Sequence, residues 1–105
     1  MAITITKPLE IQKQEFIFEV NKQAGDKILA VYPDYKQRNM TVRYLELSVL
    51  GRLDTQEALD IKGAWEWIKN VREASNTTNQ DLQSASDMAN MKVLLAQFTE
   101  NIGKL

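Results

Sequence analysis

The sequence predicts an all-α protein: a small helical bundle with a long first helix, a short N-terminal extended arm and a C-terminal coiled-coil-like helix. Apolar residues recur at spacings of three, four and seven along most of the chain, which is typical of amphipathic helices. Pro33 and Gly51 divide this pattern into helix-sized segments. Only Ile3-Thr4-Ile5-Thr6 has the alternating β-branched pattern of a strand, and it is very short.

The first two predicted elements are the arm and the long helix. Residues 1–7 form the arm, and Ile3 and Ile5 could add it as an edge strand to a neighbouring chain. Pro8 suits the first turn of a helix, and Gly25 is a possible soft point within it. Its apolar stripe comprises Leu9, Phe16, Val20, Ala24, Ile28 and Val31.

The second and third helices complete a helical domain that is predicted to span residues 8–85. Pro33 ends the first helix and opens the second, which runs to about Leu50 and stops at Gly51. Asp54 is the predicted N-cap of the third helix, with Glu57 three residues later. The polar cluster at residues 75–79 predicts a turn that ends the third helix, followed by a short helical turn around residues 81–85.

The last helix has the most regular periodicity in the chain. Residues 86–105 contain a stripe with a/d spacing of 3-4-3-4-3, which we call the C-terminal seam: Met88, Met91, Leu95, Phe98, Ile102 and Leu105. Such a seam favours self-association or contact with a partner. The alternative is an ordinary core helix that folds back onto its own bundle.

The composition excludes several kinds of chemistry. Without Cys or His, the 105-residue chain has no thiolate, no imidazole base and neither of the usual zinc ligands. No phosphate-binding glycine loop or nucleophile elbow is present, so we expect no enzyme activity, cofactor or metal. A net charge of −1 gives no electrostatic basis for binding nucleic acid or a membrane surface. No signal peptide or membrane-spanning run is visible either.

Two small groups of residues stand out as contacts or as structural positions. Trp65 and Trp67 are two residues apart, so on a helix they point in nearly opposite directions. We expect Trp65 to fill the core, and Trp67 either to anchor another subunit or to pack on the first helix. In the turn before the second helix, Pro33 fixes the backbone, and Gln37 and Asn39 could bond to backbone groups at helix ends.

Two segments in the middle of the chain resemble small helical proteins encoded in the tail-fibre and baseplate regions of tailed bacteriophages and prophages. The resemblance covers roughly residues 28–76. It rests on Tyr32-Pro33-Asp34-Tyr35-Lys36-Gln37-Arg38-Asn39-Met40 and on Trp65-Glu66-Trp67-Ile68-Lys69-Asn70-Val71-Arg72-Glu73-Ala74-Ser75-Asn76. It implies a non-enzymatic role in the phage tail and carries over no catalytic residue.

Three functions follow as expectations. The first is a homo-oligomeric structural protein of the virion tail, made in the host cytoplasm, which contacts a fibre or baseplate protein. The second is a fibre-assembly chaperone that does not stay in the particle. The third is a small DNA-binding or regulatory protein using Lys36 to Asn39, although the near-zero net charge argues against it.

Overall fold

The computed structural model describes residues 8–105, which form four helices and no strand. They are α1 (Leu9–Val31), α2 (Asp34–Val49), α3 (Gln56–Gln83) and α4 (Met88–Gly103). The all-α prediction is therefore confirmed. The predicted arm, with Ile3 and Ile5, lies outside the described residues.

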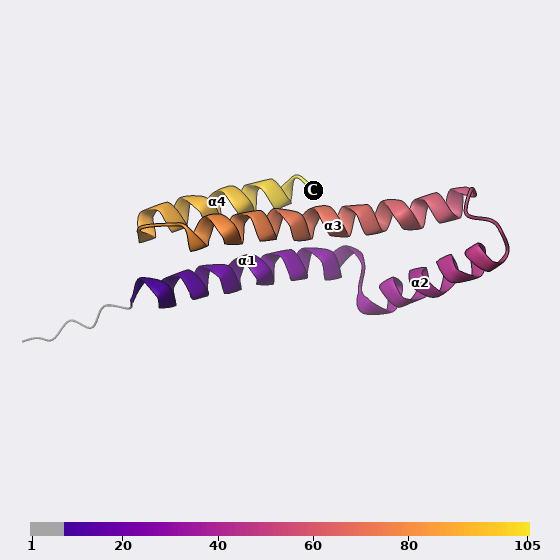
Figure 1. Cartoon of the computed structure of the whole chain (residues 1–105), viewed down its shortest axis with the longest axis horizontal. Helices are drawn as coiled ribbons and strands as arrows, with labels where there is room; N and C mark the ends of the chain where they lie inside the picture. Colours follow the sequence, from indigo (N-terminus) through magenta and orange to yellow (C-terminus); the bar gives the residue numbers. More distant parts are fainter. Residues whose placement is uncertain (1–7) are drawn as a thin grey trace, which may run out of the picture.

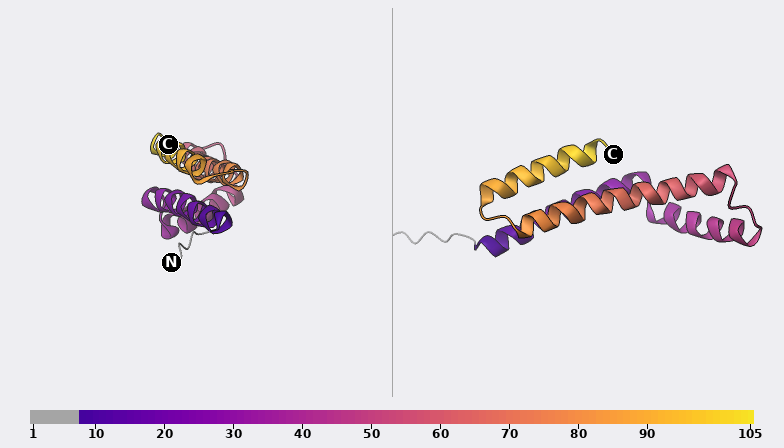
Figure 2. Two further views of the ribbon diagram at one scale, coloured as in Figure 1. Left: turned by 90° about the vertical axis from the view of Figure 1, so that its left-hand side faces the viewer. Right: turned by 45° about the horizontal axis from the view of Figure 1, so that its top comes forward.

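Helix α3 is the spine of the molecule. Its 28 residues span about 42 Å at 1.5 Å per residue. Helices α1 and α2 run one after the other along one side of α3 and antiparallel to it (Figure 1). Helix α4 folds back over the half of α3 that α1 also covers, so one end of the rod has three helices and the other has two (Figure 2).

The prediction that the third helix ends at residues 75–79 is wrong, because α3 continues unbroken to Gln83. Two polar residues of this cluster, Ser75 and Asn79, are at least partly buried and form hydrogen bonds, whereas Asn76 and Thr77 are exposed. Ser75 is buried and its hydroxyl donates to the carbonyl of Arg72 at 2.8 Å. The Asn79 amide donates to Asn21 of α1 at 2.8 Å. Asn79 therefore joins α3 to α1, and Ser75 bonds within α3, so neither side chain starts a turn.

The helix boundaries follow from caps and one glycine. Thr55, not the predicted Asp54, is the N-cap of α3, and its hydroxyl accepts from the Ala58 amide. Gly51 follows α2 with a φ of +69°, a conformation that favours glycine, as expected for the stop after that helix. Asp87 caps α4 by accepting from the Asn90 amide at 2.7 Å, so α4 begins two residues later than predicted.

Helix α1 is continuous through Gly25, so the possible soft point does not break it. Its first turns also hold the end of α3. Lys13 is only 8% exposed as a residue, and its Nζ donates to the Gln83 carbonyl at 2.9 Å. A cation at the C-terminal end of a helix satisfies a free carbonyl and interacts favourably with the helix dipole.

The core is divided between the two ends of the rod. The three-helix end has the larger cluster: Val20, Ala24, Ile28, Ile68, Val71, Leu82, Ala85, Met91, Phe98 and Ile102. The two-helix end has a cluster of only three buried residues, Leu47, Ala58 and Ile61. Trp65 packs against both clusters, so it joins them as a half-buried side chain and not as a fully enclosed one.

Candidate interaction surfaces

Most of the C-terminal seam packs within its own chain, the second of its two expected arrangements, whereas Leu105 at its end is 46% exposed. Phe98 is 2% exposed, and Met91 and Ile102 are also buried in the core formed with α1 and α3. Leu95 packs against the same core as a partly buried residue. Met88 is more exposed, at the start of α4. A 3-4 stripe serves an intramolecular bundle as well as a coiled coil, and here the neighbouring helices of the chain cover it.

Trp67 also makes its contacts inside the chain. Its ring meets Tyr32 edge to face, with 5.6 Å between the ring centroids. Its indole N–H donates to the Leu105 carbonyl at 3.1 Å, which places the end of α4 beside the middle of α3. Trp67 is half-buried by these contacts, so the alternative of packing near the first helix is the one seen.

The turn between α1 and α2 is held as predicted at one of its two polar positions. Pro33 precedes α2, and the Gln37 amide donates to the Tyr32 carbonyl at 2.7 Å, bonding the end of α1. Asn39 is exposed and makes no bond to a helix end within residues 8–105. Its side chain instead faces a hollow between α2 and α3.

That hollow, which we call the α2–α3 groove, is an open concave surface between α2 and α3. It has a volume of about 700 Å³, within the range of about 300–1,000 Å³ typical of binding sites. Its lining comprises Tyr32, Asn39, Met40, Arg43, Gln56, Glu57, Asp60, Ile61 and Ala64. Tyr32, Met40, Ile61 and Ala64 supply its apolar part, and charged side chains stand around them.

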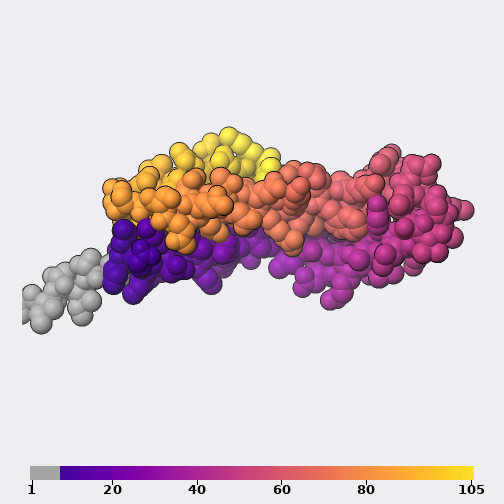
Figure 3. Space-filling model, viewed as in Figure 1, coloured from indigo at the N-terminus to yellow at the C-terminus, as the bar shows by residue number. Residues whose placement is uncertain are grey.

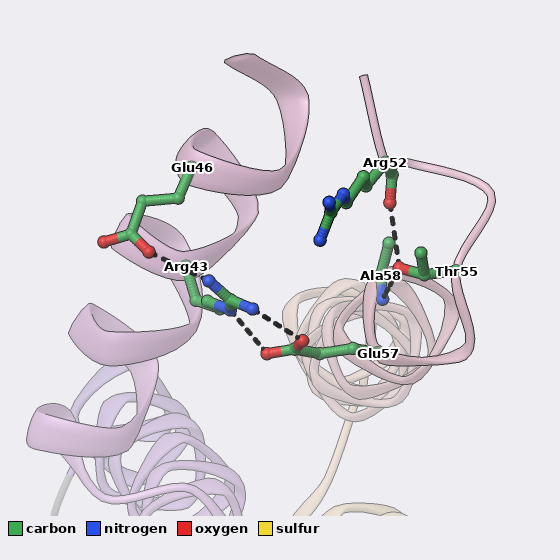
Figure 4. A network of polar contacts seen from close by, with 6 residues as sticks. All are labelled: Arg43, Glu46, Arg52, Thr55, Glu57 and Ala58. Carbon is green, nitrogen blue, oxygen red and sulfur yellow. Dashed lines mark hydrogen bonds and ion pairs between the residues drawn. The ribbon is translucent and has the colours of Figure 1, made fainter. Parts of the chain in front are cut away.

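The charged side of the groove is organised by Arg43 (Figure 4). Its guanidinium donates to both carboxylate oxygens of Glu57, at 2.6 and 3.0 Å, and to Glu46 at 3.1 Å. The hydrogen bond from Arg43 lowers the pKa of Glu57, and the bonds to Glu57 and Glu46 raise the pKa of Arg43. The bidentate pair ties α2 to the start of α3, leaving Asp60 without a cation partner among the described residues.

The face of α2 that points away from α3 is apolar as well. We call it the outer stripe of α2: Tyr35, Val42, Leu45 and Val49. These side chains are more than half exposed, and Val49 reaches 86%. They lie opposite Met40, Tyr44 and Leu47, which pack toward α3. Exposed apolar side chains gathered along one helix face are typical of contact surfaces.

Three further findings describe these surfaces and the helices that carry them. The groove lining has no hydroxyl nucleophile other than the Tyr32 phenol. Within residues 8–105, no group of three or more carboxylates lies close enough together to hold a metal ion. No described helix is long and apolar enough to cross a membrane.

Comparison with known proteins identifies no relative: no family model, no curated protein and no solved structure matches the chain.

The α2–α3 groove and the outer stripe are two surfaces that the sequence reasoning missed. The spacing of Val42, Leu45 and Val49 by three and four was visible as a second apolar stripe on the same helix. No sequence signal indicated the groove, because it arises where α4 stops.

Proposed function

We propose that the protein is a non-enzymatic structural component of a bacteriophage tail, located in the fibre or baseplate region of the virion. It acts there through contacts with copies of itself and with a fibre or baseplate protein. The proposed location in a phage tail rests on the resemblance of residues 28–76 to small helical proteins of phage tail regions.

The observation that carries a role in assembly is the incomplete two-helix end of the rod. Three buried residues form its core, and the described chain leaves both the outer stripe of α2 and the α2–α3 groove uncovered. The yellow C-terminal part of the chain does not reach this end in Figure 3. Two helices enclose little apolar surface, whereas three or four enclose a core. Packing against another chain would complete this end, as an assembly component requires.

A fibre-assembly chaperone is the second candidate. An open groove with an apolar floor that contains Met40 suits reversible binding of another chain, because methionine adapts to different partners. On this alternative the same surface would hold a fibre chain during assembly and then release it.

DNA binding through Lys36 to Asn39 is the weakest candidate. Lys36 and Arg38 are exposed, but Asp34 lies in the same first turns of α2. A groove that tracks a phosphate backbone needs several cations, and the chain as a whole carries −1.

The test is quantitative peptide mass spectrometry on purified particles of a phage that encodes the chain. A constant copy number per particle, after washing in high salt, is the expected result. Presence in the infected-cell lysate with absence from particles would contradict the structural role and favour the chaperone.

A further inference from the structure

We infer that the α2–α3 groove receives the N-terminal arm, residues 1–7, of a second copy of the chain. Ile3 and Ile5 would occupy its apolar part, and Lys7 would lie near the carboxylate of Asp60. This inference deepens the proposed self-association by naming the contact between copies.

The groove continues the path of α4. At the three-helix end, Ala74, Thr78 and Asp81 of α3 lie beside Leu94 and Phe98 of α4. About two turns before Ala74, on the same side of α3, comes Trp67, which meets the end of the chain at Leu105. The groove residues Ala64, Asp60 and Glu57 follow about three to five turns before Ala74. The groove is therefore the part of the third-helix position that α4 leaves uncovered.

The arm cannot fill the groove of its own chain. Tyr32 is the groove residue nearest to the arm along the chain, and 23 residues of α1 separate it from Pro8. At 1.5 Å per residue that helix spans about 34 Å. Ile3 lies five residues before Pro8, a reach of at most about 18 Å in a fully extended chain. An arm that enters a groove must enter that of another copy.

The chemistry of the arm matches the groove. Its apolar residues are Met1, Ala2, Ile3 and Ile5, and its one charged side chain is Lys7. The groove offers Tyr32, Met40, Ile61 and Ala64 to the apolar residues. Arg43 is already bonded to Glu57 and Glu46, whereas Asp60 accepts one hydrogen bond within residues 8–105, from Gln56 at 2.7 Å. The available charge at the groove is therefore negative and complements Lys7.

The contact does not depend on one oligomer size. Two antiparallel rods could exchange arms around a two-fold axis, and rods in series could each fill the groove of the next. Both arrangements place Ile3 and Ile5 in the groove of a neighbour.

The experiment measures the association of the full-length chain by analytical ultracentrifugation over a range of concentrations. Wild type should form species above 12.0 kDa, and excess synthetic peptide of residues 1–9 should return it to the monomer. I3D/I5D should weaken association at least about tenfold, because two aliphatic side chains lose their burial. V93D, at an exposed position of α4 far from the groove, is the matched control and should associate like wild type.

A charge exchange tests the pairing itself. K7E and D60K should each weaken association by up to about fivefold, the effect of one partly exposed ion pair, and K7E/D60K should recover it. A wild-type chain that stays monomeric to millimolar concentration would overturn the inference. Association of I3D/I5D at the wild-type level would also overturn it. That holds even if V42D/L45D, on the outer stripe of α2, abolishes association. In any of these cases, a constant copy number in particles would still support a place in the virion, while a wild-type chain that stays monomeric would leave only contacts with a fibre or baseplate protein.

Discussion

At the two-helix end, α2 and α3 share a core of only three buried residues. A few individual side chains also connect these two helices. Arg43 bonds to Glu57 across the gap between α2 and α3, and Lys62 of α3 lies over the Tyr44 ring at 5.9 Å. Tyr44 in turn meets Trp65 edge to face, with 4.9 Å between centroids. Because the Arg43–Glu57 pair is partly exposed, it contributes modestly and weakens with salt, whereas Tyr44 and Trp65 are half-buried.

The Arg43–Glu57 pair predicts a pH-dependent stability. The folded-state pKa of Glu57 lies below its ordinary value of 4.5, so the stabilisation is present at neutral pH and is lost as pH falls through that lowered pKa. We expect E57Q to be less stable than wild type at pH 7, with the difference shrinking as pH falls below 4. Urea unfolding of both proteins at pH 7 and at a pH below 4 measures this difference in stability. E66Q, at an exposed carboxylate without an ion pair in residues 8–105, should show no such trend.

Substituting Gly51 tests the cost of its backbone conformation alone, because an added side chain would meet no neighbouring atom. Its φ of +69° is costly for a residue with a side chain, yet a Cβ there would meet no atom within 4 Å. We expect G51A to lower the free energy of unfolding by about 1–2 kcal/mol. G63A, inside α3 and equally uncrowded, should instead raise it by about 0.5–1 kcal/mol. Equal effects of the two substitutions in thermal unfolding would contradict this explanation.

At the scale of helices, the main correction concerns α4. Its seam is buried against α1 and α3, so its residues should govern the stability of the isolated chain. We expect F98A to lower the free energy of unfolding by about 3–5 kcal/mol, the usual cost of removing a buried aromatic ring. Urea unfolding of F98A and V93A measures this, since V93A removes an exposed side chain and should change it by less than about 0.5 kcal/mol. An F98A chain with wild-type stability that fails only to associate would restore the partner-seam interpretation.

The sequence predicted the positions of the helices better than it predicted which helices pack against one another. Proline and glycine positions placed the ends of α1 and α2 within a residue or two, because those residues restrict the backbone locally. The C-terminal part of α3 was missed because Asn79 is paired with Asn21, 58 residues away, which no local pattern reveals. The sequence also did not determine what packs against the C-terminal seam, because a stripe with 3-4 spacing fits a helix of the same chain or of another.

At the scale of the whole molecule, the rod has two unequal ends. The three-helix end has a continuous core and a capped α4, whereas the two-helix end exposes the outer stripe of α2 and the α2–α3 groove. The larger of the two buried clusters therefore lies at the three-helix end, and the surfaces proposed for association lie at the two-helix end. The division follows from the length of α4, which covers only the C-terminal part of α3.

Hydrogen–deuterium exchange, read by mass spectrometry on dilute and concentrated protein, tests this division most directly. We expect slow exchange in α1, α4 and the C-terminal part of α3 at both concentrations, because their core is complete within one chain. Amides of α2 and of the first turns of α3 should exchange fast when dilute and slow down as copies associate. Equal protection of the two ends in dilute protein, or no change at the two-helix end on concentration, would contradict the account.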